Sequence, residues 1–333
     1  MKRIFHILLL ILACLIPVLV SSRYFIQIIN TALVFLIIVM GLNFVIGFCG
    51  QISMAQTAFW GIGAYTSALL TIKLGLSFWL ALPISALLAG IGGFMLGYPT
   101  LKLKEFYLGI ATVGFGEIVL LVLMNWTSLT NGSDGLPGIP KPAIGDFVFK
   151  TDFQFFYIIL GVVLLFLFLA VRVKNSRFGR ALQAIGNDEI AAEMAGVATH
   201  KNKMWAFALS AFYAGAAGSL YAHMIGYISP DLFVFRQTIL FMCMLMIGGS
   251  GYIAGPIIGT ALITILPEWM RFLQRFYMGI FGLVVVVLAI TIPNGITGLI
   301  EKYLPTLYSW IEPNAEIPVR KKGVIGLGIN SGD

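Results

Sequence analysis

The sequence predicts an all-α fold, a polytopic membrane bundle of about ten transmembrane helices, with about eight as the lower bound. Of the 333 residues, 59% are hydrophobic and only 11% are charged, and the mean hydropathy is +0.96. Soluble domains contain about 45–50% apolar and about 25% charged residues. Because a soluble protein could not hide this much apolar surface from water, we expect lipid to be the main solvent of the chain.

Ten apolar runs approach the length of a membrane span, which is about 20 residues with a range of about 17–25. They cover approximately residues 5–20, 25–41, 57–72, 79–97, 107–126, 153–171, 204–225, 232–249, 253–267 and 277–292. The ninth run is short and the second could continue into a broken segment, so eight to ten spans remain open. The first run, preceded by Lys2 and Arg3, could also be a signal peptide. Because further spans follow it, we interpret it as an uncleaved span.

The distribution of Lys and Arg predicts the orientation, because basic residues concentrate in cytoplasmic loops. With both ends of the chain in the cytoplasm, 14 of the 21 basic residues fall on the cytoplasmic side. Residues 127–152, rich in Gly, Pro and Asx, then form an outer loop of turns. We expect one transmembrane domain over residues 1–298 and a cytoplasmic tail over residues 299–333. In that tail, residues 299–310 are expected to form an interfacial helix, followed by a disordered end.

One polar stretch interrupts the apolar sequence, within a cytoplasmic loop expected over residues 172–203. It reads NSRFGRALQAIGNDEIAAEMAG (residues 175–196) and predicts two short helices. In the first helix an apolar stripe of Phe178, Leu182 and Ile185 lies opposite Arg177 and Arg180. Helices this short are marginal alone, so they need a surface to dock against.

The second short helix has recognisable ends. Asn187 can cap its start, where Asp188 and Glu189 place two acids at the positive end of the helix dipole. Gly196 stands where a C-terminal cap glycine belongs.

The exposed faces of this helix follow from the spacing of its residues. Ile190 and Met194 share one face, with Glu189 and Glu193 beside them. The alternative to a docking element is an ordinary connecting loop that packs against its own bundle.

A second polar interruption lies within the apolar residues themselves, at GFCGQISMAQT (residues 47–57). Irregular, polar backbone at membrane depth survives only where protein or a water-filled cavity satisfies its hydrogen bonds. We therefore predict that this segment lines the translocation path or the interface with a partner subunit, the alternative being a helix break packed inside the bundle. The interrupting residues are Gly47, Gly50, Gln51, Ser53, Gln56 and Thr57.

Glu117 is the one acidic residue well inside an expected span. A comparable Asp at that depth costs about 2.5–3.5 kcal/mol on insertion scales, so we expect Glu117 to have a partner or a role in the pathway. The candidate partners are Thr112 and a basic group on a neighbouring subunit.

Several site types are absent from the sequence. Gly-Lys does not occur, so there is no phosphate-cradling loop, and no catalytic triad, paired carboxylates or metal-ligand cluster is apparent. The three cysteines, Cys14, Cys49 and Cys243, fall inside apolar runs and are expected to be buried free thiols. We expect no enzymatic activity, no cofactor or metal on this chain, and no nucleic-acid partner.

Four stretches resemble LivM-type permeases of branched-chain amino-acid ABC importers. They are GLNFVIGFCGQISMAQTAFWGIGAYTSALL from Gly41, LKEFYLGIATVGFGEIVLLVLMNW from Leu103, NGSDGLPGIP from Asn131 and GGSGYIAGPIIG from Gly248. EIAAEMAG, from Glu189 to Gly196, also resembles the EAA-then-Gly signature of ABC permease coupling loops, although Ile190 interrupts it and the usual apolar-Leu-Pro ending is missing. Some 250 residues are covered in register. Gln56 stands where most relatives have His.

The resemblance implies a multi-pass subunit of the plasma membrane that forms the translocation pathway for leucine, isoleucine and valine. Its implied partners are a second, LivH-like permease subunit, two cytoplasmic ATPase subunits that use ATP and Mg, and an extracytoplasmic binding protein. The coupling residues implied on this chain are Arg177, Arg180, Asp188, Glu189, Ile190, Glu193, Met194 and Gly196.

Three alternatives stay open at this point. Importers of urea and short amides share the same sequence blocks. A secondary transporter would need coupling-ion groups at membrane depth, where only Glu117 is available. A structural membrane anchor would need neither ten spans nor a broken glycine-rich segment.

Overall fold

The computed structural model describes residues 22–100, 105–269 and 294–305, with isolated positions at 14, 17, 282, 291 and 308. Its described elements are mainly helices, as the sequence predicts. The long helices are α2 (Arg23–Leu42), α3 (Gln56–Lys73), α4 (Phe78–Thr100), α5 (Glu105–Asn125), α7 (Asp152–Lys174), α10 (Thr199–Ile225), α11 (Phe235–Gly248) and α12 (Ala254–Trp269). The shorter ones are the π-helix η1 (Asn43–Phe48), α6 (Thr127–Thr130), η2 (Gly132–Asp134), α8 (Arg177–Asn187), α9 (Glu189–Met194), η3 (Pro230–Phe233) and α14 (Gly295–Tyr303).

The eight long helices coincide with eight of the apolar runs in the sequence. Apart from the isolated positions named above, the other two runs, about 5–20 and 277–292, lie outside the described residues. The interpretation of the first run as an uncleaved span therefore stays a prediction. Four segments are long and apolar enough to cross a membrane: Arg23–Phe48, Phe78–Pro99, Phe106–Asn125 and Asp152–Lys174. Two further apolar helices, Phe235–Gly248 and Ala254–Glu268, are shorter. The count of about ten crossings and the cytoplasmic position of both ends stay predictions.

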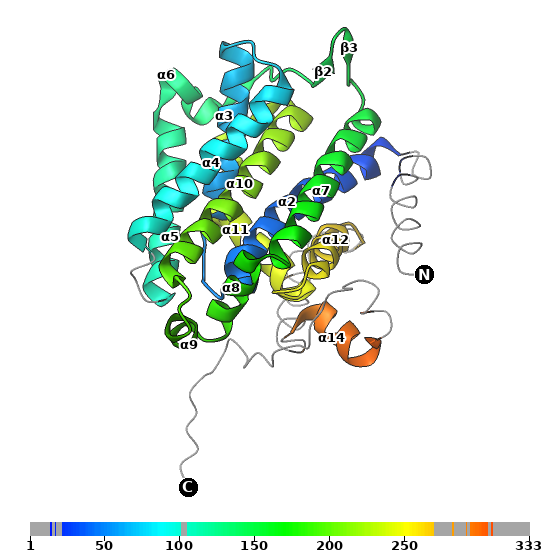
Figure 1. The fold of residues 1–333 in the computed structure, drawn as a ribbon. Helices are drawn as coiled ribbons and strands as arrows, with labels where there is room; N and C mark the ends of the chain where they lie inside the picture. Colours follow the sequence, from blue (N-terminus) through cyan, green and yellow to red (C-terminus); the bar gives the residue numbers. More distant parts are fainter. Residues whose placement is uncertain are drawn as a thin grey trace.

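α10 runs through the middle of the bundle and contacts α2, α3, α4, α7 and α8 (Figure 1). The contacts are close because small residues face each other. A Cβ added to Gly215 of α10 would lie 2.5 Å from the Cβ of Ala89 in α4, and one on Gly63 of α3 would lie 2.3 Å from the Cα of Gly215. These small residues of α3, α4 and α10 therefore allow the helices to pack closely within this chain.

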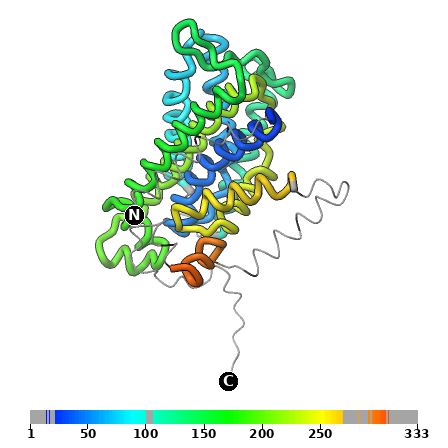
Figure 2. The backbone as a smooth tube through the Cα atoms, turned by 90° about the vertical axis from the view of Figure 1, so that its right-hand side faces the viewer, coloured from blue at the N-terminus to red at the C-terminus, as the bar shows by residue number. Residues whose placement is uncertain are grey.

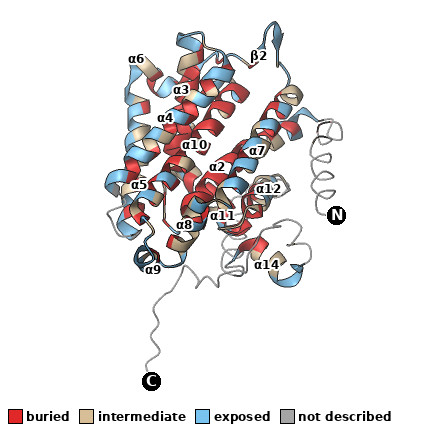
Figure 3. Ribbon diagram, viewed as in Figure 1, coloured by how far each residue is buried: buried red, intermediate tan, exposed pale blue. Residues whose placement is uncertain are grey.

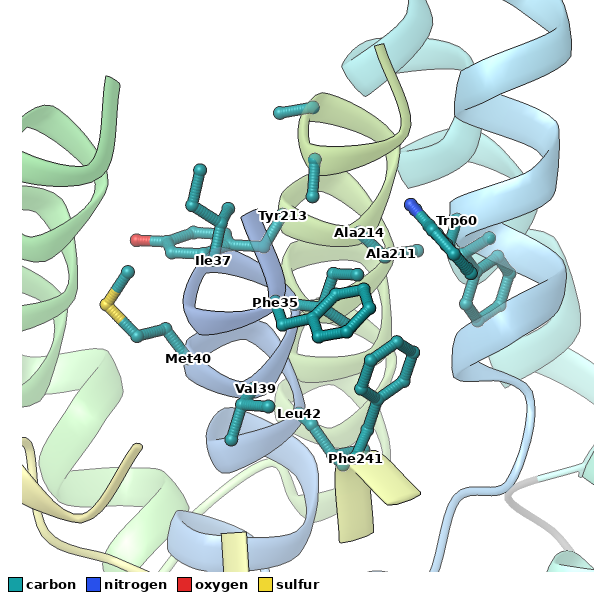
Figure 4. Close-up of a cluster of buried hydrophobic side chains, with 14 of the residues drawn as sticks. Phe35, Ile37, Val39, Met40, Leu42, Trp60, Ala211, Tyr213, Ala214 and Phe241 are labelled. Atoms are coloured by element: carbon teal, nitrogen blue, oxygen red, sulfur yellow. The ribbon is translucent and has the colours of Figure 1, made fainter. Parts of the chain in front are cut away.

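Aromatic rings fill the space between α2, α3 and α11 (Figure 4). Phe35 meets Trp60 edge-on, with 6.0 Å between ring centroids, and meets Phe241 at 5.2 Å. On the other side of α2, the Tyr213 hydroxyl donates to the carbonyl of Phe166 at 2.9 Å and ties α10 to α7. Edge-on aromatic pairs stabilise a core beyond the area that they bury.

The bundle has two distinct ends (Figure 1). At one end, the outer-loop strands β2 (Ala143–Ile144) and β3 (Phe147–Val148) form a hairpin, and β1 (Leu136–Pro137) pairs with β4 (Tyr227–Ile228) beyond α10. Arg23 and Asp152 form an ion pair of 2.6 Å at this end, where α2 and α7 begin. α8, α9 and α14 lie at the opposite end. Viewed from the side, α2 lies between α7 and α12 (Figure 2).

α14 is joined to the turn between α11 and α12. The Thr297 hydroxyl donates to the carbonyl of Gly248 at 2.6 Å, and the Tyr252 hydroxyl donates to the Glu301 carboxylate at 2.6 Å. The boundary expected between residues 298 and 299 therefore falls inside a helix that packs on the bundle. The rest of the expected tail lies outside the described residues.

Candidate functional site

α8 is an amphipathic helix whose start is capped by Ser176. The Ser176 hydroxyl accepts a hydrogen bond from the backbone N–H of Gly179 at 3.1 Å. Leu182 and Ile185 are buried, which confirms the apolar stripe expected from the sequence. Arg177 and Arg180 are exposed on the other face. α8 therefore lies flat against the end of the bundle.

The cap of α9 is Asp188, so the expected cap at Asn187 is wrong. Asn187 is the last residue of α8, whereas Asp188 has an extended backbone and its carboxylate accepts from the backbone N–H of Ala191 at 3.0 Å. The two residues are both good caps, and the end of α8 decides between them because it keeps Asn187 helical.

Gly196 ends α9 as expected, with a left-handed φ of +82°. Its backbone N–H donates to the carbonyl of Glu193 at 2.9 Å, and that of Val197 donates to the carbonyl of Ala192 at 3.0 Å. This pair of bonds is the Schellman arrangement, which satisfies carbonyls at the helix end. α9 is therefore fixed at both ends although it has only six residues.

The apolar face of α9 points away from the bundle. Ile190 is 76% exposed and Met194 is 86% exposed, although both side chains are apolar. Only Ala192 of this helix is buried. Glu193 is exposed beside the apolar pair. A short, capped helix thus presents two large apolar side chains that nothing in the described chain covers. Most of α9 is coloured as exposed, at the end of the bundle (Figure 3).

Glu189 has a partner that the sequence did not reveal. Its carboxylate forms an ion pair of 2.5 Å with the ammonium of Lys203, a residue of α10 that is 5% exposed. Glu189 and Lys203 are too far apart in the sequence for the i, i+3 or i, i+4 spacing of a helix, so no local pattern predicts the ion pair. The ion pair fastens the first turn of α9 to the start of α10.

The polar segment at residues 47–57 is an interruption between α2 and α3, as predicted. The π-helix η1 extends α2 to Phe48, residues 49–55 are irregular, and α3 begins at Gln56. Gly50 is exposed and has a left-handed φ of +70°. Such backbone is unfavourable for residues with a Cβ, which explains the glycine at this turn.

Asn43, the first residue of η1, holds the π-helix against a turn far along the chain. Its side-chain amide donates to the carbonyl of Tyr252 and accepts from the backbone N–H of Gly251, both at 2.8 Å. π-helical turns are rare and often mark functional positions. Sequence reasoning missed Asn43 because its partners lie 208 and 209 residues away.

The irregular segment runs beside α5. The backbone N–H of Met54 donates to the Thr112 hydroxyl at 3.0 Å, and a Cβ added to Gly116 would lie 4.0 Å from the Met54 carbonyl oxygen. Because Gly116 is near the midpoint of α5, the segment reaches the middle depth of the bundle. The Thr112 hydroxyl thus accepts a hydrogen bond from the Met54 N–H and donates one to the carbonyl of Gly109.

The side chains of the segment are largely enclosed by the bundle. Gln51 and Ser53 are 5% and 2% exposed. Gln56 donates to the carbonyl of Ile38 at 3.1 Å and accepts from the Ser210 hydroxyl at 3.1 Å.

Thr57 shares a hydrogen bond of 2.6 Å with Thr238 of α11. Gln56 and Thr57 therefore connect helices within this chain, and the pathway role predicted for them stays a prediction.

Glu117 does not join the other predicted pathway residues. It lies on the exposed face of α5, whereas its expected partner Thr112 is buried on the opposite side. The two polar stretches predicted from the sequence, residues 175–196 and residues 47–57, do lie next to each other, because α8 contacts η1. Within the described residues, no three His, Cys, Asp or Glu side chains gather in a way that could hold a metal ion.

Known proteins share this sequence over most of its length. The family model described as branched-chain amino acid transport system / permease component matches residues 24–290. The chain is 35% identical over 318 residues to the high-affinity branched-chain amino acid transport system permease protein LivM of Escherichia coli K12. This alignment covers 89% of this chain and 75% of that protein.

Two further relatives are more distant. The permease protein LivH of the same E. coli transport system is 26% identical over 285 residues, 79% of this chain and 90% of that protein. The ribose import permease protein RbsC of Haemophilus influenzae is 24% identical over 281 residues, 78% of this chain and 81% of that protein. No solved structure matches the chain. Because the family model spans well over half of the sequence, the chain belongs to the permease component family of branched-chain amino acid transport systems.

Proposed function

We propose that this chain is a permease subunit of an ATP-driven importer and forms part of the path by which leucine, isoleucine and valine cross the plasma membrane. The substrate class is the one named for the LivM and LivH relatives. The partners proposed are a second, LivH-like permease, two cytoplasmic ATPase subunits and an extracytoplasmic binding protein. ATP and Mg act on the ATPase subunits.

The observation that carries this proposal is the exposed apolar pair on α9. Ile190 and Met194 are 76% and 86% exposed on a helix that is capped at both ends and fastened to α10. Burying two such side chains is worth roughly 3–6 kcal/mol if burial is complete. A rigid helix with this face suits a groove on an ATPase subunit, with Arg177, Arg180 and Glu193 as a polar rim that sets the register.

The proposed orientation places α8, α9 and α14 in the cytoplasm. These elements share one end of the bundle, and the β2–β3 hairpin lies at the other (Figure 1). With the first and last apolar runs as additional spans, about ten helices cross the membrane and both termini are cytoplasmic. The predicted outer loop of residues 127–152 then faces the binding protein.

The path is proposed to follow the irregular residues 49–55. At Met54 this segment reaches the depth of the α5 midpoint, where irregular backbone is tolerated only inside protein or beside water. A cysteine at Ser53 tests this part of the proposal. Labelling by small aqueous thiol reagents in at least one transport state supports it, and protection in every state contradicts it.

The principal test is reconstitution of the full complex in vesicles. We expect uptake of leucine that needs ATP and the binding protein, and that no ion gradient can drive without the ATPase subunits. A binding-protein assay with leucine, valine, other apolar amino acids and urea identifies the substrate class. Uptake driven by an ion gradient in vesicles that contain this chain alone would overturn the proposal.

The docking role of α9 is tested by Ile190→Asp. We expect the permease to insert normally while ATPase binding or coupled transport is lost, because a carboxylate would enter an apolar contact. Ile190→Val is the matched control and should retain transport. Transport-coupled ATP hydrolysis at the wild-type rate in the Ile190→Asp complex contradicts the docking assignment.

A further inference from the structure

The exposed face of α5 carries a carboxylate in the middle of an apolar surface. Glu117 is exposed there, and no hydrogen bond or ion pair from the described residues reaches it. The large side chains around it on the same helix are apolar and exposed. They are Phe106, Tyr107, Ile110, Ile118, Leu121 and Val122.

The depth of Glu117 prevents its carboxylate from reaching water at either membrane surface. At 1.5 Å per helical residue it lies about 18 Å from the first residue of α5 and about 12 Å from the last. The side chain is much shorter than either distance. Ionisable groups at such a depth face other protein or a water-filled cavity, because lipid offers no hydrogen bonds.

The surface beside Glu117 also has a notch. A Cβ added to Gly114 would have no atom within 4 Å, while Ile110 and Ile118, one turn to either side, are 57% and 60% exposed. A glycine between two projecting side chains allows the backbone of another helix to approach closely.

α7 provides a contrast within the same chain. Only 33% of its apolar stretch is buried, compared with 28% for α5, so both helices have a wide uncovered face. Between Phe153 and Val171, however, α7 has no Asp, Glu, Lys, Arg or His side chain. The α7 face, which includes Gly161 and Leu165, has the composition expected of a surface in contact with lipid.

We propose that the exposed face of α5 is the contact surface for the second permease subunit, and that Glu117 accepts hydrogen bonds from a basic or hydroxyl side chain of that subunit. The inference rests on the proposed function, in which two permease chains form one importer. E. coli has two such permease proteins in one transport system, LivM and LivH, and both resemble this chain. The α7 face is left to lipid.

Photocrosslinking in the complete complex tests the proposal directly. A benzophenone amino acid replaces Ile118 in one variant and Leu165 in the other, since these side chains are 60% and 54% exposed. We expect a covalent adduct with the partner permease from position 118 and none from position 165. Absence of that adduct at position 118, or equal adducts from both positions, overturns the proposal.

Three further variants separate a subunit contact from other occupants. Gly114→Leu should reduce co-purification of the partner permease at least tenfold, whereas Gly161→Leu should leave it unchanged. Glu117→Gln should weaken assembly, because a neutral amide is a poorer acceptor. If Glu117→Gln leaves both assembly and transport unchanged, the proposed role of Glu117 fails.

Cysteine accessibility distinguishes a subunit contact from a water-filled cavity. Gly114→Cys, in a chain whose three native cysteines are replaced by serine, should stay unlabelled by a membrane-impermeant thiol reagent in the complex. Labelling of this cysteine in the complex overturns the proposed subunit contact and indicates an aqueous cavity. If no second permease co-purifies with the wild-type chain, the proposed function itself fails. If it co-purifies and leucine uptake is normal without the crosslink at position 118, only this inference fails.

Discussion

Gly186 of α8 packs directly on Gly50, in the irregular segment between α2 and α3. A Cβ added to Gly50 would lie 3.2 Å from the Cα of Gly186, and one added to Gly186 would lie 2.4 Å from the carbonyl oxygen of Phe48. The proposed docking element and the proposed pathway segment therefore meet through backbone atoms. Because neither glycine has a side chain to absorb a displacement, a shift of α8 must move residues 48–50 or break the contact.

Gly186→Ala tests whether this contact carries the coupling. Alanine favours a helix over glycine by about 1 kcal/mol, so any loss arises from the contact with Phe48. Overpacking typically costs about 1–3 kcal/mol, which predicts at least a tenfold loss of ATP-driven leucine uptake with ATPase binding retained. Gly161→Ala is the matched control, since an added Cβ there meets nothing within 4 Å. Equal transport by the two variants contradicts the prediction.

The ion pair between Lys203 and Glu189 is expected to hold α9 in place. Glu189→Gln leaves a buried ammonium with a weaker partner, which costs about 1–3 kcal/mol and should lower both thermal stability and ATPase co-purification. The Glu189→Gln, Lys203→Met double variant removes the unpaired charge, so it should recover the stability but not the ATPase affinity. A double variant that is no more stable than Glu189→Gln shows that the buried charge is not the cause.

The sequence predicts what depends on local pattern and composition. The apolar runs predict eight described helices, and local spacing predicts the apolar stripe of α8, the glycine cap of α9 and the break before α3. Contacts between distant residues leave no local pattern. The Lys203–Glu189 ion pair and the hydrogen bonds of Asn43 were therefore missed. Asp188 replaces Asn187 as the cap because α8 continues through Asn187.

Gln56 provides a test that separates packing from substrate contact. Its amide bridges the Ile38 carbonyl and the Ser210 hydroxyl, so Gln56→Leu should lower the free energy of unfolding by about 1–3 kcal/mol. The KM for leucine should stay unchanged, because both hydrogen bonds lie within the bundle. Gln56→His can keep one donor and one acceptor and should retain more stability. A changed KM at normal stability instead supports the pathway role.

Gly196 provides the last test, because its role depends on backbone conformation alone. With φ at +82° and no atom within 4 Å of an added Cβ, a substitution there meets strain but no clash. A β-branched residue resists this left-handed conformation, so Gly196→Val should unwind the Schellman cap and misplace Ile190 and Met194. We expect coupled transport to fall at least tenfold while membrane insertion is normal. Gly196→Asn, which tolerates the same φ, should keep most of the activity. If the Val and Asn variants transport equally well, the cap does not position the docking face.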